Sequence, residues 1–468
     1  MGLRGLCPRG EQNFDNFFKS LFVNIVKDKS IVYTMAEYIL SQRIPGFDEL
    51  INNNVADECG ILKANKITIE GAEYRVIKYD KPALTHELIG TYGLCRSIVV
   101  DGNNKVISFA PPKSIPYGVF STMYVNNYSH PLIAQEFVEG TMINVYWDNT
   151  RALWEITTRS TIGASSSFYK PSKNKTFRDM FHEALAENKM DISLFDRGMC
   201  YSFVLQHPDN RIVVPFKTAQ LYLVAVYSID NTFENVRVKT HDIYEVHKCD
   251  AFSATTVKVP RKYEWSSLLE KENKNFDPLL PKVDDYSDLV SSFGSLNTPF
   301  RQLGVIIYNM ETGERAKIRN PAYERIRHLR GNQPKIQYHY LCLRKEGKVG
   351  EFLRYYPENN DAFSGFRDQV HGFTNTLFRN YIGCYIKKER PLLEFSPQFR
   401  THMFNIHKIY TTQLKENKQF VTNLVVIKYV NDVHPTLLMH SLNHRPLLEK
   451  VEQNPLLEKV EQKVEQDS

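Results

Sequence analysis

Gln135-Glu-Phe-Val-Glu-Gly-Thr141 leads directly into Met142-Ile-Asn-Val-Tyr-Trp147, a short run in which bulky apolar residues dominate. Short β-rich runs of this kind, separated by turns such as Asp-Gly and Asp-Asn, recur from about Ile67 to Arg325. Alternation with such punctuation favours antiparallel strands joined by tight turns. The other predicted strands are Ser97–Gly102, Leu153–Thr158, Arg211–Pro215, Gln220–Val226 and Gly304–Tyr308.

Helical stretches are also expected. Two of them, near Phe177–Glu187 and Leu289–Phe293, cross the strands, so the predicted class is α+β, with antiparallel sheets and flanking helices. Ahead of the strands, apolar residues from Phe14 to Asn54 recur at helical spacing, which predicts an N-terminal helical layer. These residues are Phe17, Leu21, Ile25, Tyr33, Ala36 and Ile39.

The chain divides into four predicted parts. They are an N-terminal helical segment over residues 1–66, a strand-rich domain over 67–325, a C-terminal domain over 326–440 and a flexible tail over 441–468. Within the second part, Glu264–Ser295 is rich in Lys, Asp and Ser and is expected to be a surface insertion. In the tail, Pro446-Leu-Leu-Glu-Lys-Val-Glu-Gln453 recurs from Pro455, and so short and charged a duplication cannot build a core.

The amino-acid composition limits which binding partners and which cellular compartment are expected. The net charge of +6 permits a polyanionic partner without demanding one. Seven cysteines with no C-x-x-C pair favour reduced thiols, so a cytoplasmic location is expected, in a host cell or a virion if the source is a virus. No apolar run approaches the roughly 18 residues of a membrane span.

Seven short blocks, in a fixed order, carry the chemical interpretation. Covalent nucleotidyl transfer needs a lysine that attacks phosphorus, carboxylates for the sugar and metal, and cations for the phosphates, all from different strands. An ordered series of such blocks is therefore much stronger evidence than one block. The blocks are Tyr92–Asp101, Ile107–Lys113, Glu136–Thr141, Thr157–Gly163, Tyr201–Val214, Leu303–Ile307 and Lys317–Tyr323.

This series resembles the bacteriophage-type RNA ligase 1 family of covalent nucleotidyltransferases, over a little more than half of the chain. Tyr201–Val214 is the string most similar to the family, and Glu139-Gly140 match the end of its Lys-x-Asp/Glu-Gly motif. The resemblance implies a nucleotidyltransferase fold and a set of nucleotide- or phosphate-binding residues. That set is Arg96, Glu139, Gly140, Arg159, Lys317 and Arg319.

The departures from the family pattern concern the chemical groups. Phe137 stands at the nucleophile position, and its benzyl ring has no lone pair with which to attack a phosphate. Ser202 stands where the resemblance implies the sugar-side glutamate, and Leu303 where it implies the metal-side glutamate. No catalytic residue and no metal ligand are therefore assigned. The sequence predicts a divergent ligase body without its nucleophile, from a large DNA virus by analogy.

The expected function is that of a catalytically degenerate RNA ligase-like protein. It would bind RNA or a nucleotide, or serve as a structural part of an assembly such as a virion, so its partner would be RNA or protein. The alternative is an active ATP-dependent RNA ligase that uses ATP and Mg²⁺, with another lysine, such as Lys105 or Lys113, as nucleophile and metal held by Glu136 or Glu139. A capping-type guanylyltransferase is a third interpretation.

Several signals have ordinary explanations beside the functional ones. Each predicted cation could be a solvated surface residue, and only the set favours a phosphate-lined cleft. The basic and tyrosine-rich stretch Arg325–Tyr356 could follow a nucleic-acid backbone or could be an amphipathic face whose tyrosines pack inward. Two groups of histidines and a cysteine do not match a zinc spacing. They are His241, His247 and Cys249, and His434, His440 and His444.

Overall fold

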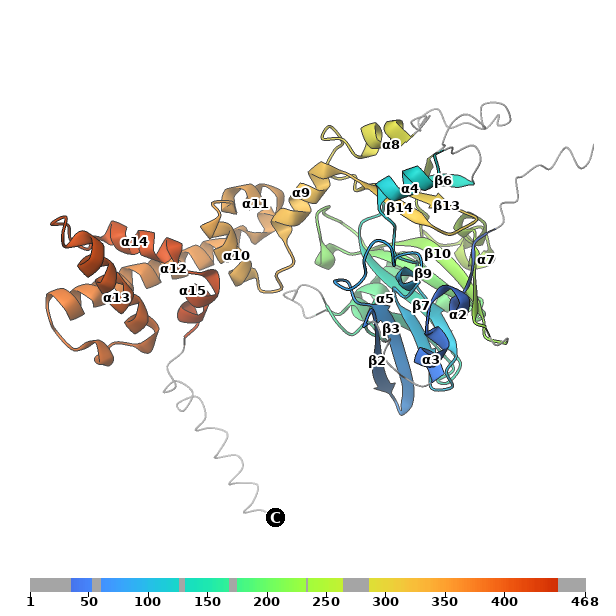
Figure 1. Cartoon of the computed structure of the whole chain (residues 1–468), viewed down its shortest axis with the longest axis horizontal. Helices are drawn as coiled ribbons and strands as arrows, with labels where there is room; N and C mark the ends of the chain where they lie inside the picture. Colours follow the sequence, from blue (N-terminus) through green and yellow to red (C-terminus); the bar gives the residue numbers. More distant parts are fainter. Residues whose placement is uncertain are drawn as a thin grey trace, which may run out of the picture. The chain divides into compact units, whose positions relative to one another are not determined.

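The computed structural model describes residues 35–52, 60–125, 131–167, 175–232, 235–263 and 286–444 (Figure 1). Contacts divide the chain into two compact units, with the boundary between Glu324 and Arg325. Residues 1–34 of the predicted N-terminal helical segment, residues 264–285 of the predicted insertion and the repeats after residue 444 lie outside the described residues.

Three antiparallel sheets build the first unit, which confirms the predicted α+β class. The six-stranded sheet has the order β1 (Glu37–Ile39), β11 (Arg237–His241), β10 (Gln220–Asp230), β9 (Met199–Gln206), β7 (Thr141–Asp148) and β8 (Leu153–Thr157). One four-stranded sheet has the order β12 (Lys262–Tyr263), β6 (Leu132–Glu136), β13 (Gly304–Asn309) and β14 (Arg315–Arg319). The other has the order β2 (Leu62–Ile69), β3 (Ala72–Tyr79), β4 (Ile98–Asp101) and β5 (Val106–Phe109).

Helices cover these sheets through apolar faces. Helix α5 (Phe177–Glu187) begins with a capping box between Thr176 and Asp179 and packs its buried side chains against the six-stranded sheet. Helices α4 (Tyr117–Met123) and α8 (Tyr286–Phe293) pack on one face of the β12–β6–β13–β14 sheet. The shorter helices are α2 (Leu40–Arg43), α3 (Phe47–Asn52), α6 (Ile243–Val246) and α7 (Asp250–Ser253).

The second unit is helical in its described residues. Its core contains a series of aromatic contacts, among them Phe352 stacked on Phe363 with ring centres 5.1 Å apart. Two π-helical turns, Ile382–Ile386 and Tyr410–Leu414, extend its two longest helices. The helices are α9 (Pro321–Arg330), which begins in the first unit, α10 (Ile336–Lys345), α11 (Val349–Tyr355), α12 (Asn360–Tyr381), α13 (Pro397–Ile409), α14 (Asn423–Asp432) and α15 (Pro435–Leu442).

Two local predictions are wrong. Glu37–Ile39 form strand β1 rather than part of a helix, because they pair with Arg237–Lys239 some 200 residues later. Arg211–Pro215 form no strand. The described end of the predicted surface insertion contains helix α8, which buries Leu289 and Phe293 against β13 and β14 and exposes Ser287, Ser291 and Ser292.

Candidate functional site

One face of the β12–β6–β13–β14 sheet carries the candidate site. The register places Gln135, Ile306 and Lys317 opposite one another on β6, β13 and β14, so they share a face of the sheet. Arg315 and Arg319 lie two residues either side of Lys317 and point to the same face. The alternate residues face the apolar core on the other side; they are Ala134, Val305, Ile307, Ala316 and Ile318.

A cavity of about 120 Å³ lies over this face. Its other wall comes from the six-stranded sheet, through Gly140, Met142, Val204 and Val224. Three strands of each sheet (β6, β13 and β14 of one, β7, β9 and β10 of the other) therefore approach the same space, which explains why its lining residues are far apart in sequence. The remaining polar and aromatic lining residues are Arg96, Gln135, Glu136, Phe137, Tyr308, Arg315 and Lys317.

Phe137 lies beneath two cations. The Lys317 ammonium nitrogen is 4.3 Å from the centre of its ring, and the guanidinium carbon of Arg319 is 5.4 Å from it. The backbone N–H of Phe137 donates to the Gly304 carbonyl at 3.3 Å, which continues the pairing of β6 with β13. A cation over an aromatic face is favourable, so the Phe137 ring stabilises the charges of Lys317 and Arg319, although it cannot act as a nucleophile.

The cations of the cavity face other cations. Burial lowers the pKa of Lys317 well below its usual value, and the charged side chains that lower it further are Arg315, Arg96, Arg319 and Lys113. Burial, followed by Arg315, likewise lowers the pKa of Arg96 to about 10. The carboxylate that lines the cavity, Glu136, is paired with Arg261 at 3.2 Å. Positive charge concentrated in this way is an arrangement that an anion would stabilise.

Arg315 is a site residue that the sequence prediction missed. It is buried, and its guanidinium donates to the carbonyl oxygens of Pro111 and Pro112 and, at 3.3 Å, to the Tyr308 hydroxyl. None of the carboxylates in the described residues pairs with it. The signal that could have found it is the alternation Arg315-Ala-Lys317-Ile-Arg319, which places three cations on one face of a strand.

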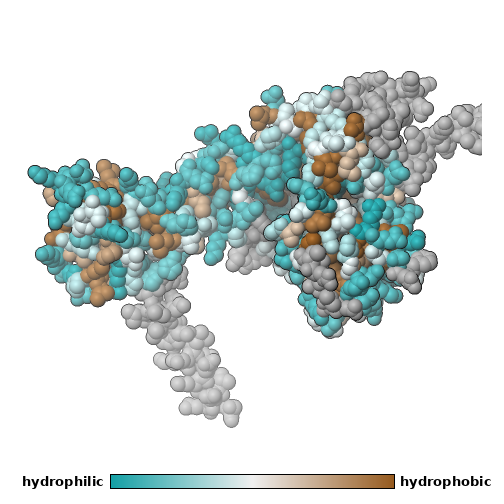
Figure 2. Space-filling model, viewed as in Figure 1, coloured by the Kyte–Doolittle hydropathy of each residue, from teal (hydrophilic) through white to brown (hydrophobic). Residues whose placement is uncertain are grey.

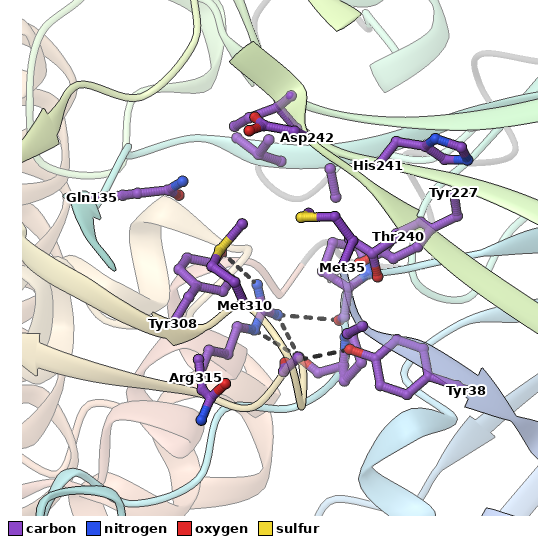
Figure 3. A pocket seen from close by; sticks show the side chains of 18 of the residues that line it. Met35, Tyr38, Gln135, Tyr227, Thr240, His241, Asp242, Tyr308, Met310 and Arg315 are labelled. Atoms are coloured by element: carbon purple, nitrogen blue, oxygen red, sulfur yellow. Dashed lines mark hydrogen bonds between the residues drawn. The ribbon is translucent and has the colours of Figure 1, made fainter. Parts of the chain in front are cut away.

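A second, smaller cavity of about 60 Å³ adjoins the first and shares Gln135, Val224, Tyr308 and Arg315 with it. Figure 3 shows Arg315 reaching between Tyr308 on one side and Tyr38 on the other. The mostly apolar lining includes Met310, so Arg315 marks the boundary between an apolar cavity and the cationic one.

Glu139 and Gly140 shape the loop that carries Phe137. The buried Glu139 carboxylate does not line the cavity; it accepts the backbone N–H of Val213 at 2.8 Å and of Val214 at 3.2 Å. Burial raises its pKa, although these hydrogen bonds oppose the shift. At Gly140, φ is +149°, and a β-carbon would lie 2.4 Å from the Leu205 carbonyl oxygen. Only glycine allows this close approach of the loop to β9.

Arg159 and Arg319 lie at the edges of the site. Arg159 does not line the cavity: it donates to the Tyr79 carbonyl at 2.8 Å and stacks on the Tyr79 ring, with 4.6 Å to the ring centre. Arg319 is exposed and forms an ion pair with Glu324 at 2.6 Å. The structure therefore brings Arg96, Gly140 and Lys317 to the cavity and Arg319 to its rim.

The two remaining positions that the resemblance singled out are buried and outside the cavity. The Ser202 hydroxyl, on β9, donates to the Asn144 side chain on β7 at 2.8 Å. Leu303 lies before β13, and its carbonyl accepts the N–H of Asn320 at 2.9 Å. In the described residues, no group of three or more His, Cys, Asp or Glu side chains is arranged to hold a metal ion.

The other candidate residues have local partners. His241 bonds to the Ser228 hydroxyl, and His247 to the Val257 carbonyl, each at 2.8 Å. Lys105 is exposed in the turn after β4, whereas Lys113 is among the cations that lower the pKa of Lys317. No helix within the described residues is long and apolar enough to cross a membrane.

The chain is similar in sequence to two viral proteins. No protein-family model matches the chain. The immediate-early protein ICP-46 homolog of Invertebrate iridescent virus 6 is 23% identical over 443 residues, which cover 84% of this chain and 89% of that protein. The RNA ligase of Rhodothermus phage RM378 is 31% identical over 107 residues, 21% of this chain and 24% of that protein.

Solved structures with some similarity are nucleic-acid ligases. An archaeal ATP-dependent RNA ligase is 12% identical, with 69% of this chain and 70% of that chain covered and a TM-score of 0.37. A putative ATP-dependent DNA ligase from Aquifex aeolicus is 11% identical, with 84% and 76% covered and a TM-score of 0.35.

Proposed function

We propose that this chain is a catalytically degenerate RNA ligase-like protein that binds the phosphates of RNA or of a nucleotide in the cationic cavity around Phe137. The observation that carries the proposal is the concentration of positive charge around Lys317. Lys317, half-buried, is surrounded by Arg96, Lys113, Arg315 and Arg319, and the lining carboxylate is already engaged by Arg261. Phosphate oxygens are the ligands that such a set of guanidinium and ammonium groups binds best.

The lack of catalysis follows from the same residues. Position 137 offers no nucleophile, and two carboxylates near it in sequence are engaged: Glu136 is paired with Arg261, and Glu139 is held by backbone N–H groups. The local similarity to a phage RNA ligase supports the ligase-like assignment. RNA is the expected polyanion, with binding that weakens as salt rises.

An equilibrium binding experiment tests the proposal. We expect 5′-phosphorylated single-stranded RNA to bind with an affinity that Arg319→Glu lowers about tenfold at low salt. Arg319 is exposed, so loss of its surface ion pair with Glu324 should cost at most about 1 kcal/mol and leave the protein folded. Lys239→Glu, at an exposed position on β11, is the matched control. If the two variants bound RNA with equal affinity, the proposal that RNA binds in this cavity would be rejected. The remaining proposal would be a structural role in an assembly such as a virion.

The second candidate, an active ATP-dependent RNA ligase, is favoured by one specific observation. Lys317 combines a lowered pKa with a position 4.3 Å from the ring that occupies the nucleophile position. A neutral amine there could attack the α-phosphorus of ATP, forming an N–P bond and releasing pyrophosphate and a proton. The cations fit the phosphates of ATP, but the described residues offer no ready set of ligands for Mg²⁺.

A further inference from the structure

Helix α14 of the helical unit has an exposed apolar face. Leu424 and Ile427, one turn apart on the helix, are 76% and 36% exposed, and Phe420, just before the helix, is 74% exposed. On the opposite side of the helix, Val426 and Val430 are fully buried. Figure 2 shows that hydrophobic side chains reach the surface of the helical unit among mostly hydrophilic ones. Large apolar side chains exposed this close together form a patch of the kind that marks a binding surface.

Cations lie beside this face. Lys428 is exposed and follows Ile427 directly on α14. From α10, the Arg344 guanidinium donates to the Asn431 side chain, and the Lys345 ammonium donates to the Asp432 carbonyl at 3.3 Å. Residues 325–444 as a whole carry 18 Arg and Lys side chains against nine Asp and Glu. The segment that suits the α14 face is therefore apolar on one side and acidic next to that side.

The last repeats of the chain have this pattern. Residues 455–466 lie outside the described residues, but their sequence places four apolar side chains at i, i+1, i+4 and i+8, on one side of a helix. These are Leu456, Leu457, Val460 and Val464. Three glutamates at i, i+3 and i+7 lie on the neighbouring side; they are Glu458, Glu461 and Glu465. Residues 446–468 carry six acidic and three basic side chains, so their charge is opposite to that of the helical unit.

The connecting chain is long enough for these repeats to reach the face. Asn443, just after α15, donates to the Gln337 side chain of α10 at 2.7 Å, and Arg344 of α10 contacts α14 at Asn431. Gln337 and Arg344 are about 10 Å apart along α10, and Leu424 lies about 10 Å from Asn431 along α14. Residues 444–455 span up to about 40 Å when extended. The distance to be covered is therefore well within the reach of this connection.

We propose that residues 455–466 bind, as an amphipathic helix, to the exposed apolar face of α14 in the same chain. The leucine and valine side chains of the segment cover Leu424 and Ile427, and its glutamates lie toward Lys428. So short a helix is marginal in water by itself, so helix formation and binding occur together. The duplicated sequence cannot build a core of its own, but it can complete the apolar face of another helix. This inference does not depend on the cationic site around Phe137.

Amide hydrogen exchange of the full chain, measured by mass spectrometry, tests this binding. We expect residues 456–464 to exchange about tenfold more slowly than in a free peptide of the same sequence. Leu424→Asp should abolish this protection without unfolding α14, because an acidic residue is favourable in the first turn of a helix. Leu393→Asp, equally exposed at 76% but outside α14, is the matched control and should keep the protection. Exchange as fast as in the free peptide, or full protection in Leu424→Asp, would overturn the proposal.

Two further measurements examine the charges and the identity of the bound segment. Lys428→Glu should reduce the protection of residues 456–464, and salt should weaken it in the natural protein, because opposite charges face each other. Protection that neither change affects would overturn the placement of the glutamates beside Lys428. Sedimentation gives the oligomeric state at the same concentrations. Protection that grows with protein concentration, together with a dimer that Leu424→Asp dissociates, would show that the face binds a second copy and would overturn binding within one chain.

Discussion

Replacing Lys317 by methionine should have two effects of opposite sign. In the absence of an anion, the free energy of unfolding should rise, because a charge surrounded by other cations is removed. Methionine keeps an unbranched side chain in contact with the Phe137 ring, so little packing is lost. The affinity for an anion such as inorganic pyrophosphate should fall, because one of its binding groups is gone.

The size of the first effect follows from the geometry. The charges of Lys317 and Arg319 lie 4.3 and 5.4 Å from the centre of the same ring, so they are at most about 10 Å apart. At that distance, with an effective dielectric constant of about 20, two unit charges repel by roughly 1.7 kcal/mol. Arg319 is 42% exposed and paired with Glu324, which screens this repulsion. The lost cation–π contact also opposes the gain, so we expect a net stabilisation of about 1 kcal/mol.

The affinity for pyrophosphate should fall roughly ten- to hundredfold, the usual consequence of losing a hydrogen bond to a charged group. Urea unfolding measures the first effect and isothermal titration calorimetry the second. Lys239→Met, at an exposed position on β11, is the control and should change neither. A Lys317→Met protein that is less stable than the natural protein and still binds pyrophosphate normally would refute the idea that the cations around Lys317 form an anion-binding site.

Three further predictions concern the loop and the titration of the site. Glu139→Gln should lower the free energy of unfolding by about 1–3 kcal/mol in urea, because the Val213 and Val214 N–H groups would face an amide; Glu136→Gln, at a half-buried position, should cost less. Gly140→Ala should cost more than about 3 kcal/mol, since its β-carbon would collide with a backbone oxygen, and equal stability to the natural protein would contradict that geometry. Sulfate binding should take up protons, because the anion raises the lowered pKa of Lys317, and the affinity for sulfate should therefore fall as pH rises through that pKa. Calorimetry in two buffers of different ionisation enthalpy would detect the proton uptake. Proton uptake that persists in Lys317→Met would show that Lys317 is not the group that takes up the proton.

The sequence predicted the strands well where alternation and turns act locally. Arg211–Pro215 misled the prediction because its β-branched residues are typical of a strand, yet the Glu139 carboxylate takes the N–H groups that a neighbouring strand would need. Glu37–Ile39 misled it because pairing with Arg237–Lys239 depends on contacts that no local pattern reveals. Long-range partners, rather than propensity, decided both segments.

The candidate site was predictable in part. Ordered short blocks singled out Arg96, Gly140 and Lys317, which line the cavity. The burial of Glu139 could not be predicted in the same way. Its carboxylate is a group that often binds ligands, but here its partners are backbone N–H groups. Arg315 was missed because the resemblance gave it no role, although its strand position places it beside Lys317.

On the function proposed above, the protein binds phosphates without forming a covalent bond to them. Incubation with ATP labelled at the α-phosphate, in the presence of Mg²⁺, followed by denaturing electrophoresis, tests this directly. We expect no radioactivity on the denatured chain, either in the natural protein or in Lys317→Met. Label that survives denaturation in the natural protein and disappears in Lys317→Met would contradict it and identify Lys317 as the nucleophile of a working ligase.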